Sequence, residues 1–193
     1  MLADKVLTAD DVVQLGHAQY FADDPLAIAD ELERAADQGR LADPADTAFA
    51  LLTAVDICER QGEFERALTL ADRAVVAERA RGGAAWSARA CRAGLLLRVG
   101  REEDKAMTDL TEMRQQLTTT DEAVTLVGET LEFGGRAEVG VAWLTEALED
   151  MVPGGPAGDP DRLPALVRSL ASERRRLRKR LGLAPDHYDD LGN

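Results

Sequence analysis

Three stretches of the chain share one pattern of apolar and polar positions. Each joins two segments of helical periodicity through a glycine, which is followed by a charged and then an amphipathic run. The three stretches are residues 60–74, 98–113 and 133–148. Their turn glycines, Gly62, Gly100 and Gly135, are 38 and 35 residues apart. A period of this length is typical of helix-pair repeats.

The residues after the turn glycines also recur. Small or apolar residues follow Gly62 and Gly135 at matching offsets: Phe64, Ala67, Leu68, Ala71 and Ala74 in one copy, and Ala137, Gly140, Val141, Leu144 and Ala147 in the other. The middle copy has one extra residue, so that Ala106 takes the small position. We therefore expect Ala67, Ala71 and Gly140 to be buried where helices cross.

These residues resemble the tetratricopeptide repeat (TPR) family, in which a first helix, a turn with glycine and a second helix with small residues stack into a right-handed superhelix. The resemblance covers about residues 44–152, and the family's bulky first-helix position falls on Leu51, Arg89 and Val124. A degenerate fourth copy spans residues 15–36. The resemblance implies an all-α, right-handed TPR-like solenoid.

Capping signals agree with about four antiparallel helix pairs in residues 1–152. Thr8 is an N-cap before an acidic first turn, and Asp24 and Asp43 each precede a proline that can open a helix. Residues 153–160 are rich in proline and glycine and are expected to form a linker.

Beyond the linker, Asp161 can cap a ninth, basic amphipathic helix within residues 161–183. Its apolar face, which includes Leu166, Leu170 and Leu177, is suited to cap the repeats. The tail, residues 184–193, is expected to be flexible.

Composition supports the helical class. The 193 residues are 45% hydrophobic but only 4% aromatic, so the core must consist mainly of Ala, Leu and Val, which suits closely packed helices. No apolar run is long enough to span a membrane, and no signal peptide is readable, so we expect a cytoplasmic protein. Cys58 and Cys91 lie in apolar helical stretches and are expected to be buried, reduced thiols.

The resemblance implies a partner-binding groove lined by first helices. Its expected residues are His17, Tyr20, Phe49, Leu52, Asp56, Glu59, Leu97, Glu129 and Glu132, with Asp10 and Val13 from the degenerate copy. The formal net charge is −13, and an acidic body attracts basic partners. We expect an acidic, partly apolar groove that binds a basic or amphipathic protein segment. The alternative is that these carboxylates are ordinary solvated helix faces.

A basic run offers a different function. Its six cations lie within seven positions: Arg174, Arg175, Arg176, Arg178, Lys179 and Arg180. They could contact nucleic acid or another anionic surface. Alternatively, the helix is a structural cap whose cations face the acidic body and its own C-terminal dipole.

Few residues in the sequence suggest catalysis. His17 and His187 are far apart and lie in no catalytic motif, and the glycines form no phosphate-binding loop. We therefore expect neither an enzyme nor a cofactor or metal site, but a protein-binding scaffold.

Overall fold

The computed structural model describes residues 5–152 and 163–192, and these are helical. Within them no strand is formed; the one β-type pairing is an isolated parallel bridge between Leu7 and Leu41. The expected all-α class is thus confirmed. The predicted linker at 153–160 and the expected N-cap Asp161 lie outside the described residues. None of the described helices is both long and apolar enough to cross a membrane.

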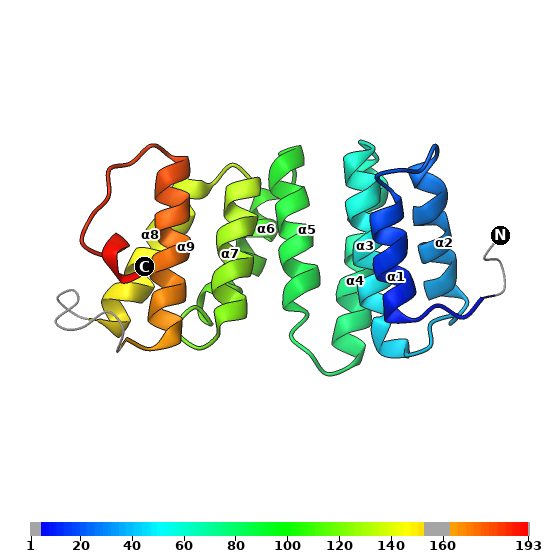
Figure 1. The fold of residues 1–193 in the computed structure, drawn as a ribbon, viewed down its shortest axis with the longest axis horizontal. Coiled ribbons are helices and arrows are strands. Elements are labelled where there is room, and N and C mark those ends of the chain that lie inside the picture. The colour runs from blue at the N-terminus through cyan, green and yellow to red at the C-terminus, as the bar shows by residue number, and fades with distance from the viewer. Residues whose placement is uncertain (1–4, 153–162, 193) are drawn as a thin grey trace. The chain divides into compact units, whose positions relative to one another are not determined.

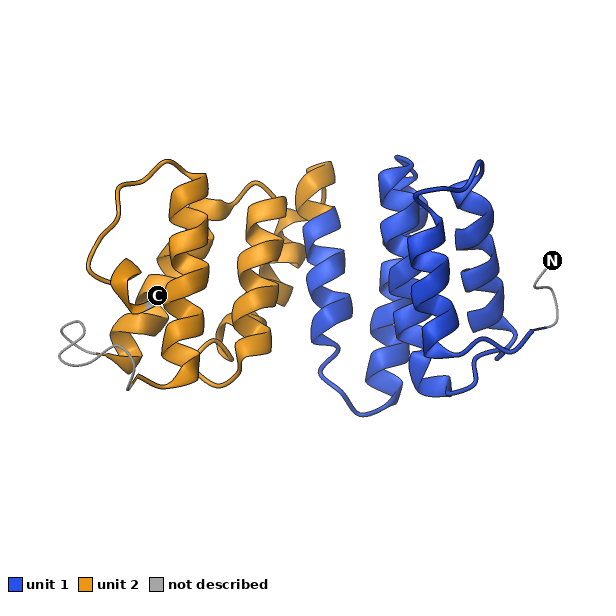
Figure 2. Cartoon of the chain, in the orientation of Figure 1, with its two compact units in different colours: residues 1–95 blue, residues 96–193 orange. Residues whose placement is uncertain are grey.

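The chain divides into two compact units, residues 1–95 and 96–193, coloured separately in Figure 2. Figure 1 labels the helices. The first unit contains α1 (Ala9–Ala18), α2 (Pro25–Asp37), the 3₁₀ turn η1 (Pro44–Asp46), α3 (Thr47–Arg60), α4 (Phe64–Ala80) and most of α5 (Trp86–Val99). The second contains the end of α5, α6 (Glu103–Arg114), α7 (Asp121–Phe133), α8 (Ala137–Met151), α9 (Ala165–Arg180) and the 3₁₀ turn η3 (Asp189–Gly192). Helices α6, α7 and α8 thus fall in the same unit as α9.

Helix α3 is the centre of the first unit. It forms an antiparallel hairpin with α4 and also packs against α2 and α1. The small residues Ala67 and Ala71 on α4 are fully buried, as the repeat pattern predicted. Their lack of side-chain bulk lets α4 lie close to its neighbours.

Local signals place the helix starts of this unit. Thr8 and Asp11 form a capping box at α1, in which each side chain accepts a hydrogen bond from the other residue's backbone N–H. Asp24 caps α2 as predicted. Asp43 caps only the short turn η1, and α3 begins at Thr47. The third helix therefore starts three residues later than the proline had suggested.

The predicted turn glycines lie in turns between helices and have a left-handed backbone conformation. Gly62, Gly100 and Gly135 have φ values of 79°, 65° and 70°. At the first of them the Glu63 N–H donates to the Cys58 carbonyl at 2.8 Å, the six-to-one bond of a Schellman motif. The same bond follows α5 and α7, so α3, α5 and α7 all end in the same type of turn.

The second unit repeats the packing of the first. Helix α9 packs against both α8 and α7, as α3 packs against α2 and α1. Gly140 on α8 is buried, and a Cβ added to it would lie 2.7 Å from Leu177 Cδ1 on α9. The expected helix crossing at Gly140 is confirmed.

The C-terminal residues differ from the prediction. Helix α9 begins at Ala165 rather than at 161. The tail that we expected to be flexible folds back instead: η3 packs against α9 and buries Tyr188, Asp189 and Leu191. Its anchoring by charged residues is described below.

Candidate partner-binding groove

A groove runs between α1 and α3 in the first unit. The helices approach closely where Gly16 faces α3, since a Cβ on Gly16 would lie 3.1 Å from Thr53 Cγ2. The groove has a volume of about 460 Å³ and is lined by Val12, Val13, Gly16, His17, Gln19, Tyr20, Phe49, Leu52, Thr53 and Asp56. Six of the residues expected to line a groove are thus brought together: Val13, His17, Tyr20, Phe49, Leu52 and Asp56. Asp10 is not among the lining residues.

The rim of this groove is apolar and exposed to solvent. Val13, Tyr20 and Phe49 are 42%, 58% and 41% exposed, and Phe21, the neighbour of Tyr20, is 90% exposed. Exposed side chains of this size carry a cost in water that is removed when a partner covers them. Their clustering at one groove distinguishes this surface from isolated exposed apolar residues, which need no explanation.

One end of the groove is polar, but its charge is already neutralised. The Asp56 carboxylate accepts hydrogen bonds from Gln19 Nε2 at 3.0 Å and from Arg60 Nε at 2.9 Å. Arg60 in turn lies over the Tyr20 ring, 5.2 Å from its centroid, and its ion pair with Asp56 raises its pKa. Asp56 therefore acts as an internal acceptor that fixes Gln19 and Arg60, and the groove is more apolar than the sequence had suggested.

The remaining predicted groove residues do not line this groove. Glu59 is half-buried on α3 and is not among the lining residues. Leu97 belongs to the second unit and is a buried core residue, packed so closely on Gly134 that a Cβ there would lie 2.6 Å from its Cδ1. Glu129 is exposed on α7, and Glu132 is ion-paired with α9.

The pair α7 and α9 is the counterpart of α1 and α3 in the second unit. Gly128 faces α9 as Gly16 faces α3: a Cβ on Gly128 would overlap the Glu173 side chain. Here, however, the facing residues are charged. Arg176 bridges Glu132 of α7 and Glu173 of α9, and these bonds raise its pKa. Charged side chains that pair with each other thus lie where α7 and α9 face each other.

The six cations of the basic run are divided among different environments. Arg174 is buried, 3% exposed, so it is not part of an exposed basic patch. Arg174 and Arg178 bind the tail, and Arg176 binds Glu132 and Glu173. Arg180 Nε lies 3.6 Å from Glu132 Oε1. Arg175 and Lys179 are exposed. Acidic groups of the same unit therefore hold Arg174, Arg176, Arg178 and Arg180, which is the arrangement expected of a structural helix.

Other candidate chemistry stays dispersed. His17 lines the groove, whereas His187 lies in the tail with its ring 4.1 Å from that of Tyr188. Cys58 is buried, and burial raises the pKa of its thiol; Cys91 is only half-buried. Among the described residues, no three or more His, Cys, Asp or Glu side chains are grouped as metal ligands would be.

Sequence reasoning missed Val12, Gly16, Gln19 and Thr53 as groove residues. Gln19 follows the last residue of α1 and has no place in the repeat pattern, so no signal pointed to it. Comparison with known proteins adds no relative: no family model matches the chain, and no curated protein matches its sequence.

Proposed function

We propose that this chain is a non-enzymatic, protein-binding scaffold of TPR-like helix pairs, and that it binds an amphipathic segment of a partner protein in the groove between α1 and α3. The observation that carries the proposal is the exposed apolar rim of Val13, Tyr20 and Phe49 around a preformed groove. Preformed apolar grooves with a few fixed polar groups are the usual sites for helical or extended segments.

The repeat architecture is part of the same proposal. Its support is internal: α3 packs on α2 and α1 as α9 packs on α8 and α7, and Gly16 and Gly128 mark equivalent close approaches. The left-handed glycine turns recur at the expected period.

The partner segment should be apolar on the side that faces the groove and basic at its flanks. Apolar contacts match the rim, whereas Arg60 and Asp56 neutralise each other and offer no net charge. The basic flanks follow from the formal charge of −13, which attracts cationic segments and repels nucleic acid. Since Arg174, Arg176, Arg178 and Arg180 of the basic run are held by acidic groups of their own unit, the groove is the better-supported site.

Selection from a random peptide library tests this function. Peptides that bind the protein should carry apolar residues at helical spacing together with Lys or Arg. Binding of a selected peptide should weaken about tenfold or more when Phe49 is changed to Ser or Leu52 to Asp, because loss of a central apolar contact typically costs about 1–3 kcal/mol.

The matched control is Val76→Asp, which alters an exposed apolar residue of α4 outside the groove. It should leave the affinity unchanged. Peptides whose affinity is insensitive to Phe49→Ser and Leu52→Asp, or equally sensitive to Val76→Asp, would show that the groove is not the binding site.

A further inference from the structure

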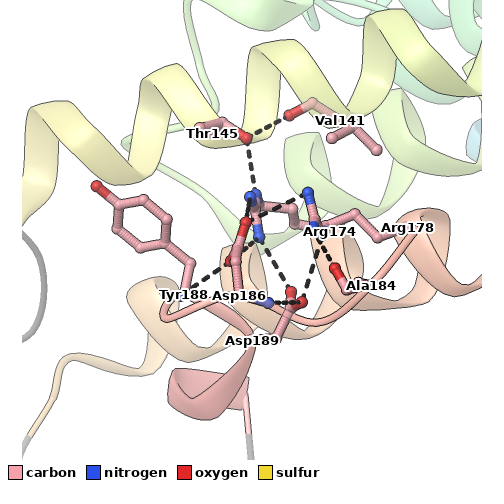
Figure 3. Close-up of polar contacts among 8 residues, drawn as sticks. All are labelled: Val141, Thr145, Arg174, Arg178, Ala184, Asp186, Tyr188 and Asp189. Carbon is pink, nitrogen blue, oxygen red and sulfur yellow. Dashed lines mark hydrogen bonds and ion pairs between the residues drawn. The ribbon is translucent and has the colours of Figure 1, made fainter.

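The C-terminal tail is bound to the body of the second unit like a short peptide ligand (Figure 3). Asp186 receives two hydrogen bonds from the Arg174 guanidinium, at 2.9 Å and 2.5 Å, one to each carboxylate oxygen. Asp189 accepts a third from Arg174 at 3.0 Å. Between these two aspartates, Tyr188 places its ring 5.4 Å from the Arg174 guanidinium carbon. Bidentate, charge-assisted contacts of this kind recognise carboxylates specifically.

The receiving surface is built by α8 and α9 and not by the tail. Arg174 Nε donates to Thr145 Oγ1 of α8 at 2.7 Å, and the Thr145 hydroxyl donates to the Val141 carbonyl at 2.7 Å. This chain of bonds fixes the guanidinium before any carboxylate is bound. Arg178, one turn further along α9, supplies a second cation 3.2 Å from Asp186 and 3.3 Å from Asp189.

Apolar contacts complete the recognition. Tyr188 and Leu191 are 5% and 1% exposed, so the tail inserts one aromatic and one aliphatic side chain beside its two carboxylates. The bound pattern is therefore Asp-x-Tyr-Asp-x-Leu, residues 186–191.

Two features make the tail exchangeable. The bond between Arg178 and Asp189 is imperfect, since Arg178 Nε is buried without a hydrogen-bond partner in the described structure. The tail is also joined to α9 by a short connection that contains Gly182, with φ 68°, and Pro185, so it can move away without unwinding the helix. By contrast, the corresponding partner of α3 is the 17-residue helix α4, which cannot detach from α3 without unfolding.

We propose that this surface of α8 and α9 is a second peptide-binding site, specific for acidic segments of the pattern Asp-x-Tyr-Asp-x-Leu in a partner protein, and that the chain's own tail occupies it until such a segment displaces it. The tethered tail has an effective concentration on the order of millimolar, so a competing segment must bind more tightly than the tail or be presented at high local concentration. A better-fitting segment gains a hydrogen bond from Arg178 Nε, which the chain's own tail leaves without a hydrogen-bond partner in the described structure.

The test uses the full chain and a fluorescein-labelled peptide with the sequence of residues 183–192. Changing Asp186 and Asp189 to Asn weakens the chain's own tail while Arg174 and Arg178 stay in place. The peptide should bind this variant about tenfold or more tightly than it binds the wild type, because the competing tail is weakened. The matched control, Asp121→Asn with Asp190→Asn, removes the same charge from exposed positions and should behave as the wild type. A peptide with Asn at both aspartates should not bind.

Each remaining outcome decides the matter. A folded Asp186→Asn, Asp189→Asn variant that fails to bind the peptide, or a wild type that binds it equally well, overturns the proposal. If the variant is unfolded by circular dichroism, recovery of helix on addition of the peptide supports the site, and no recovery overturns it. Light scattering tests whether the tail of a second copy occupies the site in place of a partner segment. A concentration-dependent dimer of the wild type would show that tails exchange between copies and would overturn the proposal.

Discussion

The close crossing of α8 and α9 at Gly140 allows a quantitative test of the packing. An alanine there gains about 1 kcal/mol of helix propensity relative to glycine. Its Cβ would, however, lie 2.7 Å from Leu177 Cδ1, and Leu177 is fully buried, so it has little room to move. Overpacking of this kind costs about 1–3 kcal/mol. The net expectation for Gly140→Ala is a loss of up to about 2 kcal/mol in the free energy of unfolding.

A second substitution isolates the cause. Valine has no Cδ1, so Leu177→Val removes the clashing atom at a cost of about 1 kcal/mol. In that background Gly140→Ala should stabilise the protein by up to about 1 kcal/mol, because only the propensity gain is left. Urea denaturation followed by circular dichroism measures all four variants of the cycle. If Gly140→Ala has the same effect in the wild type as in the Leu177→Val background, the crossing does not limit the size of residue 140, and the reasoning is refuted.

Three further outcomes follow from the same structure. The hydrogen bond from Lys5 lowers the pKa of Asp11 to about 2, and the one from Arg174 lowers that of Asp186 to about 2. Both pKa values lie below those of the same side chains in the unfolded chain, so the ionised carboxylates stabilise the fold. This stabilisation is complete above about pH 4 and is lost as the pH falls to about 2. Acid denaturation should therefore be less steep in the Asp→Asn variants. Because burial raises the pKa of Cys58, its thiol should react slowly with Ellman's reagent until urea unfolds the chain. Leu170→Ala should lower stability by about 2–5 kcal/mol and Arg175→Ala by under about 1, since Leu170 is fully buried and Arg175 is exposed; equal losses in thermal melts would contradict this packing of α9.

The features that the sequence predicted well are those set by local chemistry. The Schellman glycines need a backbone conformation that other residues disfavour, and Ala67 and Gly140 leave the space that crossing helices require. Six of the ten residues that line the groove were predictable for the same reason. Tyr20 and Phe49 fall at groove positions of the predicted repeats, so both were expected on the same side of the molecule.

The features that were missed depend on pairing between distant side chains. Asp56 looked like an acidic groove residue, but Arg60 neutralises its charge and Gln19 donates a hydrogen bond to it, and no periodicity reveals such partners. The tail is polar and lacks a helical period, so it looked unstructured. Its order comes from ion pairs with Arg174 that form only after the chain reverses at Gly182.

The two proposed sites rest on different physical forces, and this makes them separable in one experiment. The groove offers apolar surface and an internally neutralised ion pair, so salt should weaken only the attraction between the basic flanks of the ligand and the acidic protein, and the apolar contacts with Tyr20 and Phe49 should persist. The tail site depends on ion pairs from Arg174 and Arg178 to carboxylates of the ligand. Salt screens this attraction once the ligand has left the buried position. Raising sodium chloride from about 50 mM to about 500 mM should therefore release an acidic peptide from α9 but leave a groove ligand bound.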